Sequence, residues 1–188
     1  MDKSEKEIMD ATNSALQKHS YSELSIQNIA DEFEKSKSLL YHHYDGKDEI
    51  LLDFLDHMLE QFREEALSEE DKEFGDRFED RAFMAFDICQ DCDFLKTLTE
   101  LRTHALRDER YREKFDRFEE LYTERVQELL EEGQRKAEFR QDFEPEDLAN
   151  FVSLINHEAL YRRAEDRDLE DSREELRNYL RSRVFRLD

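Results

Sequence analysis

Apolar residues in the first third of the chain recur three and four positions apart, the spacing of one face of an α-helix. This pattern predicts helices over about residues 5–18, 26–33 and 37–44, and a longer helix over 47–67. Ser25 stands immediately before the second of these, where its hydroxyl would accept a hydrogen bond from an unpaired backbone N–H. The chain therefore opens with a series of amphipathic helices.

The second and third predicted helices are joined by a very short link. Only Glu34 and Lys35 separate them from each other, and Ser36 holds the capping position before the third helix. So short a link forces the two helices to cross steeply. Helix, short turn and helix is the helix-turn-helix arrangement, whose second helix enters the DNA major groove.

Polar side chains on and around the second helix of this pair suit contact with DNA. Lys37, Ser38 and His42 are hydrogen-bond donors that we expect to reach base edges. Tyr41 adds a ring and a hydroxyl, and Lys47 opens the next helix, where phosphate can bind. The predicted DNA-binding residues are Gln27, Ser36, Lys37, Ser38, Tyr41, His42 and Lys47.

The segment over residues 8–52, which contains these residues, resembles the N-terminal DNA-binding domain of TetR/AcrR-type repressors. The resemblance is carried by a serine, a leucine–tyrosine pair and an aromatic residue over 36–44, followed by Lys47. Where the family usually has a glycine and an apolar residue before the serine, this chain has Glu34 and Lys35. The resemblance implies a DNA-binding domain over 1–46 and an effector-binding and dimerisation domain over 47–188.

The remainder of the chain also shows helical periodicity. It predicts helices over about 74–88, 94–105, 109–137, 145–164 and 169–187. The predicted fold is all-α: an N-terminal three-helix helix-turn-helix domain, then a C-terminal helical ligand-binding and dimerisation domain, about nine helices in all.

The resemblance further implies a homodimer, a ligand pocket and a palindromic DNA operator. In that family the last two helices of each subunit pack against those of its partner. The residues predicted for this interface are Ile155, Ala159, Leu176, Leu180 and Val184. The residues predicted to line the pocket are Phe83, Phe86, Phe94, Leu98, Phe118, Tyr122 and Phe151. Aromatic residues at helical spacing are also typical of an ordinary core, so both interpretations of the second set stay open.

Composition narrows the classes of protein that the chain can represent. It has only 3 Gly and 1 Pro, which argues against hairpins and glycine-rich phosphate loops. No apolar run reaches the length of a transmembrane helix, and no apolar signal segment is present at the N-terminus. We expect a cytoplasmic protein that does not contact a membrane.

The charge is unusual for a protein that meets DNA. Acidic residues number 51 and basic residues 29, for a net charge of −22. One interpretation is an acidic helical protein-interaction module without DNA binding. The other is adaptation to a cytoplasm of very high salt, where an acidic surface keeps proteins soluble. The local excess of lysine over 35–47 favours the second.

Other chemistry finds little support. Cys89 and Cys92 form a lone CxxC without a second pair, for which two buried helical cysteines are the simpler interpretation. His57, His104 and His157 lie on three different predicted helices. Because no catalytic motif is present, we expect neither an enzyme, a cofactor nor a metal. The predicted function is a homodimeric repressor released from its operator by a small, largely apolar or aromatic ligand.

Overall fold

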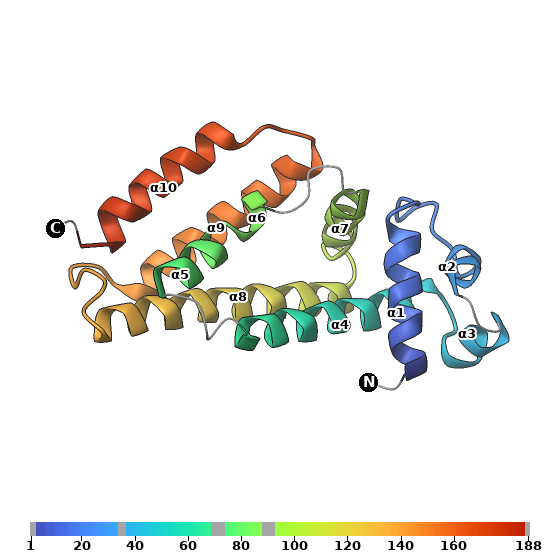
Figure 1. The fold of residues 1–188 in the computed structure, drawn as a ribbon. Coiled ribbons are helices and arrows are strands. Elements are labelled where there is room, and N and C mark those ends of the chain that lie inside the picture. Colours follow the sequence, from blue (N-terminus) through green and yellow to red (C-terminus); the bar gives the residue numbers. More distant parts are fainter. Residues whose placement is uncertain (1–2, 34–36, 69–73, 88–92, 187–188) are drawn as a thin grey trace. The chain divides into compact units, whose positions relative to one another are not determined.

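A computed structural model describes residues 3–33, 37–68, 74–87 and 93–186 of the chain (Figure 1). These residues form ten α-helices, and the β-structure among them is a single bridge between Phe139 and Phe185. The chain divides into two compact units. The first unit comprises Met1–Glu64 with Asp91–Asp116, and the second comprises Glu65–Gln90 with Arg117–Asp188.

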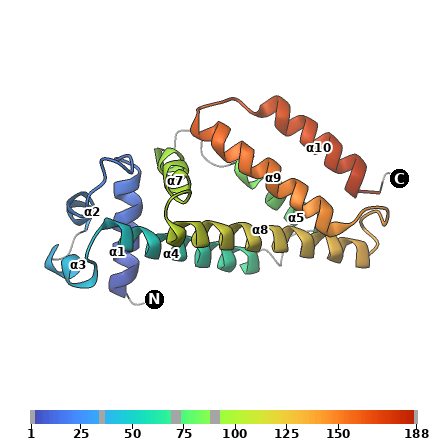
Figure 2. The same cartoon turned by 180° about the vertical axis from the view of Figure 1, so that it is seen from behind.

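The first unit contains the helices expected for the DNA-binding region together with parts of three others. Helices α2 and α3 lie beside α1 in both views (Figures 1 and 2). The beginnings of α4 and α8 and the whole of α7 complete the unit. The bounds are α1 Lys3–Leu16, α2 Ile26–Glu32, α3 Lys37–His43, α4 Lys47–Ser68, α7 Asp93–His104 and α8 Glu109–Arg135.

The core of the first unit is apolar and continuous from α1 to α8. Leu16, Ile29 and Leu40 are almost completely buried in it. The ring of Phe54 on α4 meets that of Phe94 on α7 edge to face, with centroids 6.2 Å apart. The predicted apolar faces of the N-terminal helices are therefore the ones that pack.

The second unit contains four complete helices, the remainder of α8 and the last residues of α4. Its helices are α5 Phe74–Ala82, α6 Met84–Asp87, α9 Pro145–Ala164 and α10 Glu170–Val184. Three aromatic rings, Phe78, Phe139 and Phe185, pack edge to face at one end, with the Phe139 and Phe185 centroids 5.0 Å apart. Gly133 permits this packing, because a Cβ there would lie only 2.1 Å from Phe139 Cδ2.

Helix α10 is held to α5 and α6 by arginine side chains. Arg173 binds the carboxylate of Asp87 through two hydrogen bonds of 3.0 Å. Its guanidinium also lies over the ring of Phe83, 5.1 Å from the centroid. Just over two turns further along α10, Arg181 Nε lies 3.4 Å from Glu79 Oε1. Charge and ring contacts thus supplement the buried apolar face of α10.

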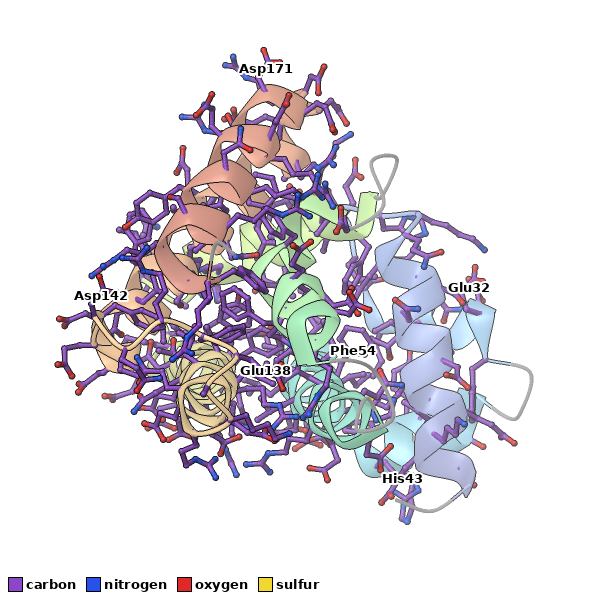
Figure 3. The ribbon with its side chains drawn as sticks, turned by 60° about the vertical axis from the view of Figure 1, so that its left-hand side comes forward. Glu32, His43, Phe54, Glu138, Asp142 and Asp171 are labelled. Atoms are coloured by element: carbon purple, nitrogen blue, oxygen red, sulfur yellow. The ribbon has the colours of Figure 1, made fainter. Side chains whose placement is uncertain are left out.

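The structure confirms the fold class predicted from the sequence but changes one of the predicted helices. The all-α fold class is confirmed, but the single helix expected over 74–88 is two helices, with a turn at Phe83. No described helix combines the length and apolar character needed to cross a membrane. Acidic side chains such as Glu138, Asp142 and Asp171 are exposed and project outward (Figure 3). The predicted functional division at residue 46 stays a prediction.

Candidate nucleic-acid interface

Helix α2 begins with a complete capping box. Ser25 Oγ accepts a hydrogen bond from the backbone N–H of Asn28 at 3.2 Å, as the sequence predicts for a capping serine. In return, Asn28 Oδ1 accepts from the backbone N–H of Ser25 at 2.9 Å. Two otherwise unpaired donors are thereby satisfied, which fixes where α2 starts. The role of Asn28 was missed, although a polar residue three positions after a capping serine was a usable signal.

The turn between α2 and α3 falls outside the described residues. Glu34, Lys35 and Ser36 therefore keep only their predicted roles. Helix α3 is anchored from its inner side, because Leu40 is fully buried and its carbonyl accepts from Tyr44 N–H at 3.0 Å. The opposite side of α3 is left facing outward.

The outward side of α2 and α3 presents most of the predicted DNA-binding residues. Ser38 and His42 are exposed on α3, and Tyr41 is 50% exposed. Gln27 is exposed on α2, where its Nε2 donates to Asp31 Oδ1 at 2.8 Å. Lys37 is the first residue of α3, but its side chain is outside the described part. The exposed groups are donors and rings that fit base edges and phosphates.

Lys47, the first residue of α4, has a second role that the sequence did not indicate. Its ammonium donates to the backbone carbonyls of Tyr21 at 2.7 Å and Leu24 at 3.0 Å. It also lies over the Tyr21 ring, 4.2 Å from the centroid. Lys47 therefore holds the loop that leads into α2. Its predicted contact with phosphate stays a prediction.

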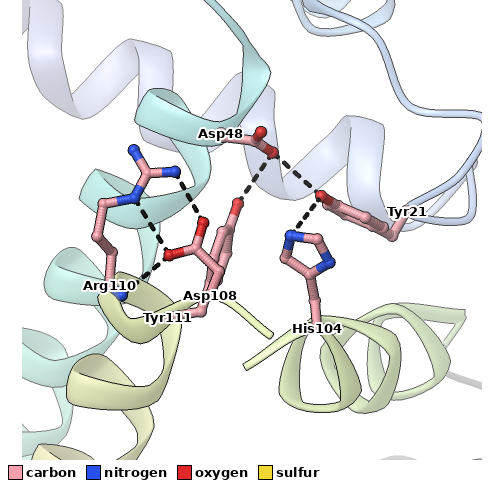
Figure 4. A network of polar contacts seen from close by, with 6 residues as sticks. All are labelled: Tyr21, Asp48, His104, Asp108, Arg110 and Tyr111. Atoms are coloured by element: carbon pink, nitrogen blue, oxygen red, sulfur yellow. Dashed lines mark hydrogen bonds and ion pairs between the residues drawn. The ribbon is translucent and has the colours of Figure 1, made fainter. Parts of the chain in front are cut away.

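Tyr21 is also the centre of a polar network within the first unit (Figure 4). Its hydroxyl donates to Asp48 Oδ1 at 3.1 Å and lies 3.3 Å from His104 Nε2. The hydroxyl of Tyr111 donates to the same Asp48 oxygen at 3.2 Å. The backbone N–H of Tyr21 donates to Glu100 Oε2 at 2.6 Å. One loop residue is thus bonded to α4 and α7, and through Asp48 it is connected to α8.

This environment changes the acidity of the phenols. Burial, followed by the negative charge of Asp48, raises the pKa of Tyr21 to about 12. The same two causes raise the pKa of Tyr111. Both hydroxyls therefore remain protonated donors at any physiological pH. No local pattern in the sequence could have shown this network, because its members come from four separate segments.

The residues predicted to line a ligand pocket are divided between the two units. Phe83, Phe86 and Tyr122 are buried in the second unit, where the first two rings lie 5.9 Å apart. Phe118 is half-buried there, whereas Phe151 is 40% exposed. The other two, Phe94 and Leu98, pack against the core of the first unit. The pocket itself stays a prediction.

The residues predicted for a dimer interface lie mainly inside the subunit. Ile155 is half-buried, and the other four are buried: Ala159, Leu176, Leu180 and Val184. The same two helices, α9 and α10, expose another apolar set. It comprises Phe151, Leu154, Tyr161 and Tyr179, of which Leu154 is 68% exposed.

The remaining candidates add no further site to the described structure. Cys89 and Cys92 are outside the described residues. His157 Nδ1 lies 3.5 Å from Glu119 Oε1 in the second unit. Within the described part of the chain, no group of three or more His, Cys, Asp or Glu side chains is placed to hold a metal ion.

The helices of this interface match a known family of proteins. Residues 8–54 match the model of a family described as bacterial regulatory proteins, tetR family. This N-terminal region is similar to the DNA-binding region of the tetR family. The matched segment contains α1 to α3 and the start of α4, so the predicted resemblance to TetR-type regulators is confirmed. No curated protein matches the sequence.

Solved structures extend the likeness over nearly the whole chain. A TetR transcription regulator from Haloarcula marismortui is 28% identical with a TM-score of 0.83, covering 96% of this chain and 98% of that one. A putative transcriptional regulator from Saccharomonospora viridis, solved in complex with choline, has a TM-score of 0.82 at 14% identity, with 100% of each chain covered. The fatty acid degradation regulator FadR from Bacillus halodurans has a TM-score of 0.71 at 19% identity, covering 96% and 95%. The chain has the fold of TetR-family transcriptional regulators, which are DNA-binding proteins rather than enzymes.

Proposed function

We propose that the protein is a homodimeric repressor that binds a palindromic operator through α3 and leaves it when a small ligand binds in the second unit. The observation that carries this proposal is the exposed donor face of α3 in a region that is similar to the DNA-binding region of the tetR family. A cytoplasmic location follows from this role.

The proposed DNA contacts depend on an unusual choice of side chains. Residues 1–62 contain no arginine, so cationic contacts from the first helices come from lysine and histidine. Lys37, Ser38, His42 and Gln27 would read base edges, while Ser36, Tyr41 and Lys47 would hold phosphates. Without the bidentate arginine–guanine pair, specificity depends on lysine, amide and hydroxyl contacts and on shape.

Net charge also shapes the way in which the protein would bind. A molecule of net charge −22 has a weak non-specific attraction for DNA. At ~1 M salt the Debye length is roughly 3 Å, so repulsion between the acidic surface and DNA is largely screened. We therefore expect operator affinity to depend weakly on KCl, or even to rise with it.

The proposed dimer uses the exposed apolar surface of α9 and α10. Phe151 and Tyr179 form its centre, with ring centroids 5.5 Å apart, and Leu154 and Tyr161 extend it along α9. The predicted residues Ala159, Leu176, Leu180 and Val184 form the layer beneath, with Ile155 between the two. A two-fold dimer brings two α3 helices to half-sites about one turn of DNA apart.

The proposed effector is a small, largely apolar or aromatic molecule bound in the second unit. Phe83, Phe86 and Tyr122 give that unit a buried aromatic interior. Proteins of the same fold have been solved with choline and with stearoyl-CoA, ligands of very different chemistry. For such a ligand to release DNA, it and the operator must favour different conformations of the protein.

A gel shift with DNA from upstream of the protein's own gene, run in molar KCl, tests the proposal. The wild type should retard this DNA, and Tyr41→Ala should bind all DNA more weakly. Lys6→Ala changes an exposed lysine on α1 and should leave binding unchanged. If no band is retarded at any protein concentration, the alternative gains support: an acidic helical protein-interaction module without DNA binding.

A further inference from the structure

The interruption between α5 and α6 is the feature of the second unit that the periodicity did not predict. Helix α5 ends at Ala82 and α6 begins at Met84. In one continuous helix, the N–H of Ala85 would donate to Arg81 O and that of Phe86 to Ala82 O. Phe86 N–H instead donates to the carbonyl of Phe83, at 2.9 Å.

The other backbone groups at this break, two carbonyls and one N–H, form hydrogen bonds with side chains from two other helices. Tyr122 on α8 donates its hydroxyl to Arg81 O at 2.9 Å. Asn156 on α9 accepts from Ala85 N–H at 2.9 Å and donates to Ala82 O at 2.7 Å. A hydroxyl and an amide therefore take the place of two helical hydrogen bonds.

This substitution occurs in the interior of the unit. Asn156 is 3% exposed and Tyr122 is 4% exposed, so water does not compete for these backbone groups. A buried carbonyl or N–H without a partner is costly. Two arrangements satisfy them all: the side-chain bonds seen here, or the direct bonds of a continuous helix. A continuous helix at Phe83 would therefore leave these backbone groups as well bonded as they are here, provided that the Tyr122 hydroxyl and the Asn156 amide found other partners.

The far end of α6 is also held by side chains. Arg163, near the end of α9, donates through Nη2 to the carbonyl of Phe86. Asp87, the last residue of α6, binds Arg173 on α10 through both carboxylate oxygens. A change of backbone at Phe83 moves α6, and these bonds pass the movement to α9 and α10, which carry the proposed dimer surface.

We propose that the α5–α6 junction is a two-state switch, kept broken by Tyr122 and Asn156 and closed into one helix when these side chains are drawn away. This inference rests on the proposed function, because Tyr122, Phe83 and Phe86 are the residues predicted to meet the effector. A ligand that bonds to Tyr122 or Asn156 would release the backbone groups to each other. Ligand binding would thus change helix continuity.

The test measures the junction directly, in the full-length protein without ligand or DNA. Hydrogen exchange follows the amides of Ala85 and Phe86, and the Cα chemical shift of Phe83 reports whether it is helical. In Asn156→Leu, which keeps the branched shape of the side chain and removes the amide, we expect the switch to close. Ala85 N–H then stays protected by Arg81 O, and the Phe83 shift becomes helical. If Asn156 is only a static support, Ala85 N–H exchanges about ten- to a hundredfold faster and Phe83 keeps its turn shift, which would overturn the proposal.

Two more variants make the result independent of folding defects. Tyr122→Phe keeps the ring and removes only the hydroxyl, and it should also move the Phe83 shift towards the helical value. An unchanged turn shift in this variant would count against the switch. Asn150→Leu alters an exposed asparagine on the same helix and should change neither readout. Because the experiment uses no DNA, its failure leaves the repressor proposal standing, and a failed gel shift leaves this result standing.

Discussion

Lys47 lies over the ring of Tyr21, with Nζ 4.2 Å from the ring centroid and 2.7 Å from the backbone oxygen of the same residue. Tyr21 belongs to the loop before α2, and Lys47 is the first residue of α4. With the bond to Leu24 O, two of the three ammonium donors are used inside the protein. Among the described residues these are the bonds of the ammonium, and the proposed phosphate contact would use the third donor.

Replacing Lys47 with methionine should affect both roles, which two separate measurements can follow. Lys47→Met leaves two backbone carbonyls without their charged donor and removes the contact with the Tyr21 ring. We expect the free energy of unfolding to fall by about 1–2 kcal/mol and operator affinity to fall as well. Urea unfolding and fluorescence anisotropy measure the two effects. Lys6→Met, which changes an exposed lysine on α1, should alter neither. Unchanged stability in Lys47→Met would show that the lysine acts on DNA alone.

The Tyr21 phenol predicts a dependence of stability on alkaline pH. Its pKa is about 12 in the folded protein and about 10 when the chain is unfolded. Its contribution to stability is therefore fully present below pH ~10 and is lost as the pH rises through about 12. In Tyr21→Phe, the decline in unfolding free energy over this interval should be shallower than in the wild type. Urea unfolding at a series of pH values measures the slope.

Tyr21→Phe should also lower the free energy of unfolding near neutral pH. Asp48 loses one of its two phenolic donors but keeps the bond from Tyr111, so the network is weakened rather than abolished. Loss of one such bond should cost about 1 kcal/mol. Identical slopes in the two proteins above pH ~10 would mean that the Tyr21 phenol is neither buried nor held by Asp48 in solution.

The features predicted most accurately from the sequence are helix ends and caps, which depend on residues close together in the chain. The helix over 145–164 has the bounds that were expected, because Pro145 and the acidic residues after it favour a helix start. Ser25 caps α2 for the same local reason. The N-terminal pattern was also specific enough to predict the resemblance to TetR-type regulators, which the match over residues 8–54 confirms.

The features that were missed arise from contacts between distant segments. The apolar pattern over 74–88 continues without interruption, and the break at Phe83 exists because Tyr122 and Asn156 bind the backbone there. The spacing of apolar residues also could not show which face of α9 is buried. That helix has apolar residues on more than one side, and Leu154 was not predicted to be exposed.

Leu154 provides the sharpest test of the proposed dimer. It is 68% exposed on α9, so Leu154→Glu adds a charge without disturbing the subunit's own core. If α9 and α10 pair across a two-fold axis, this carboxylate would be buried without a partner, and the dimer should dissociate. Sedimentation in molar KCl measures the change. Leu106→Glu is the matched control, since Leu106 is 80% exposed in the turn after α7 and should leave the dimer intact. A monomeric wild type, or equal dissociation by both variants, would contradict the proposal.

Ala137, two residues after the end of α8, has a backbone conformation that glycine adopts more easily. Its φ is 59°, its N–H donates to Gln134 O at 3.0 Å, and the next N–H, of Glu138, donates to Gly133 O at 3.0 Å. This is the Schellman arrangement, in which glycine is usual at the left-handed position. Ala137→Gly removes the strain of a left-handed alanine, but it also raises the conformational entropy of the unfolded chain. The first effect is the larger, so we expect the unfolding free energy to rise by about 0.5–1 kcal/mol. Thermal unfolding measures it, with Glu124→Gly in the exposed middle of α8 as the control that should lose stability. A loss of stability in both variants would mean that Ala137 is not left-handed in solution.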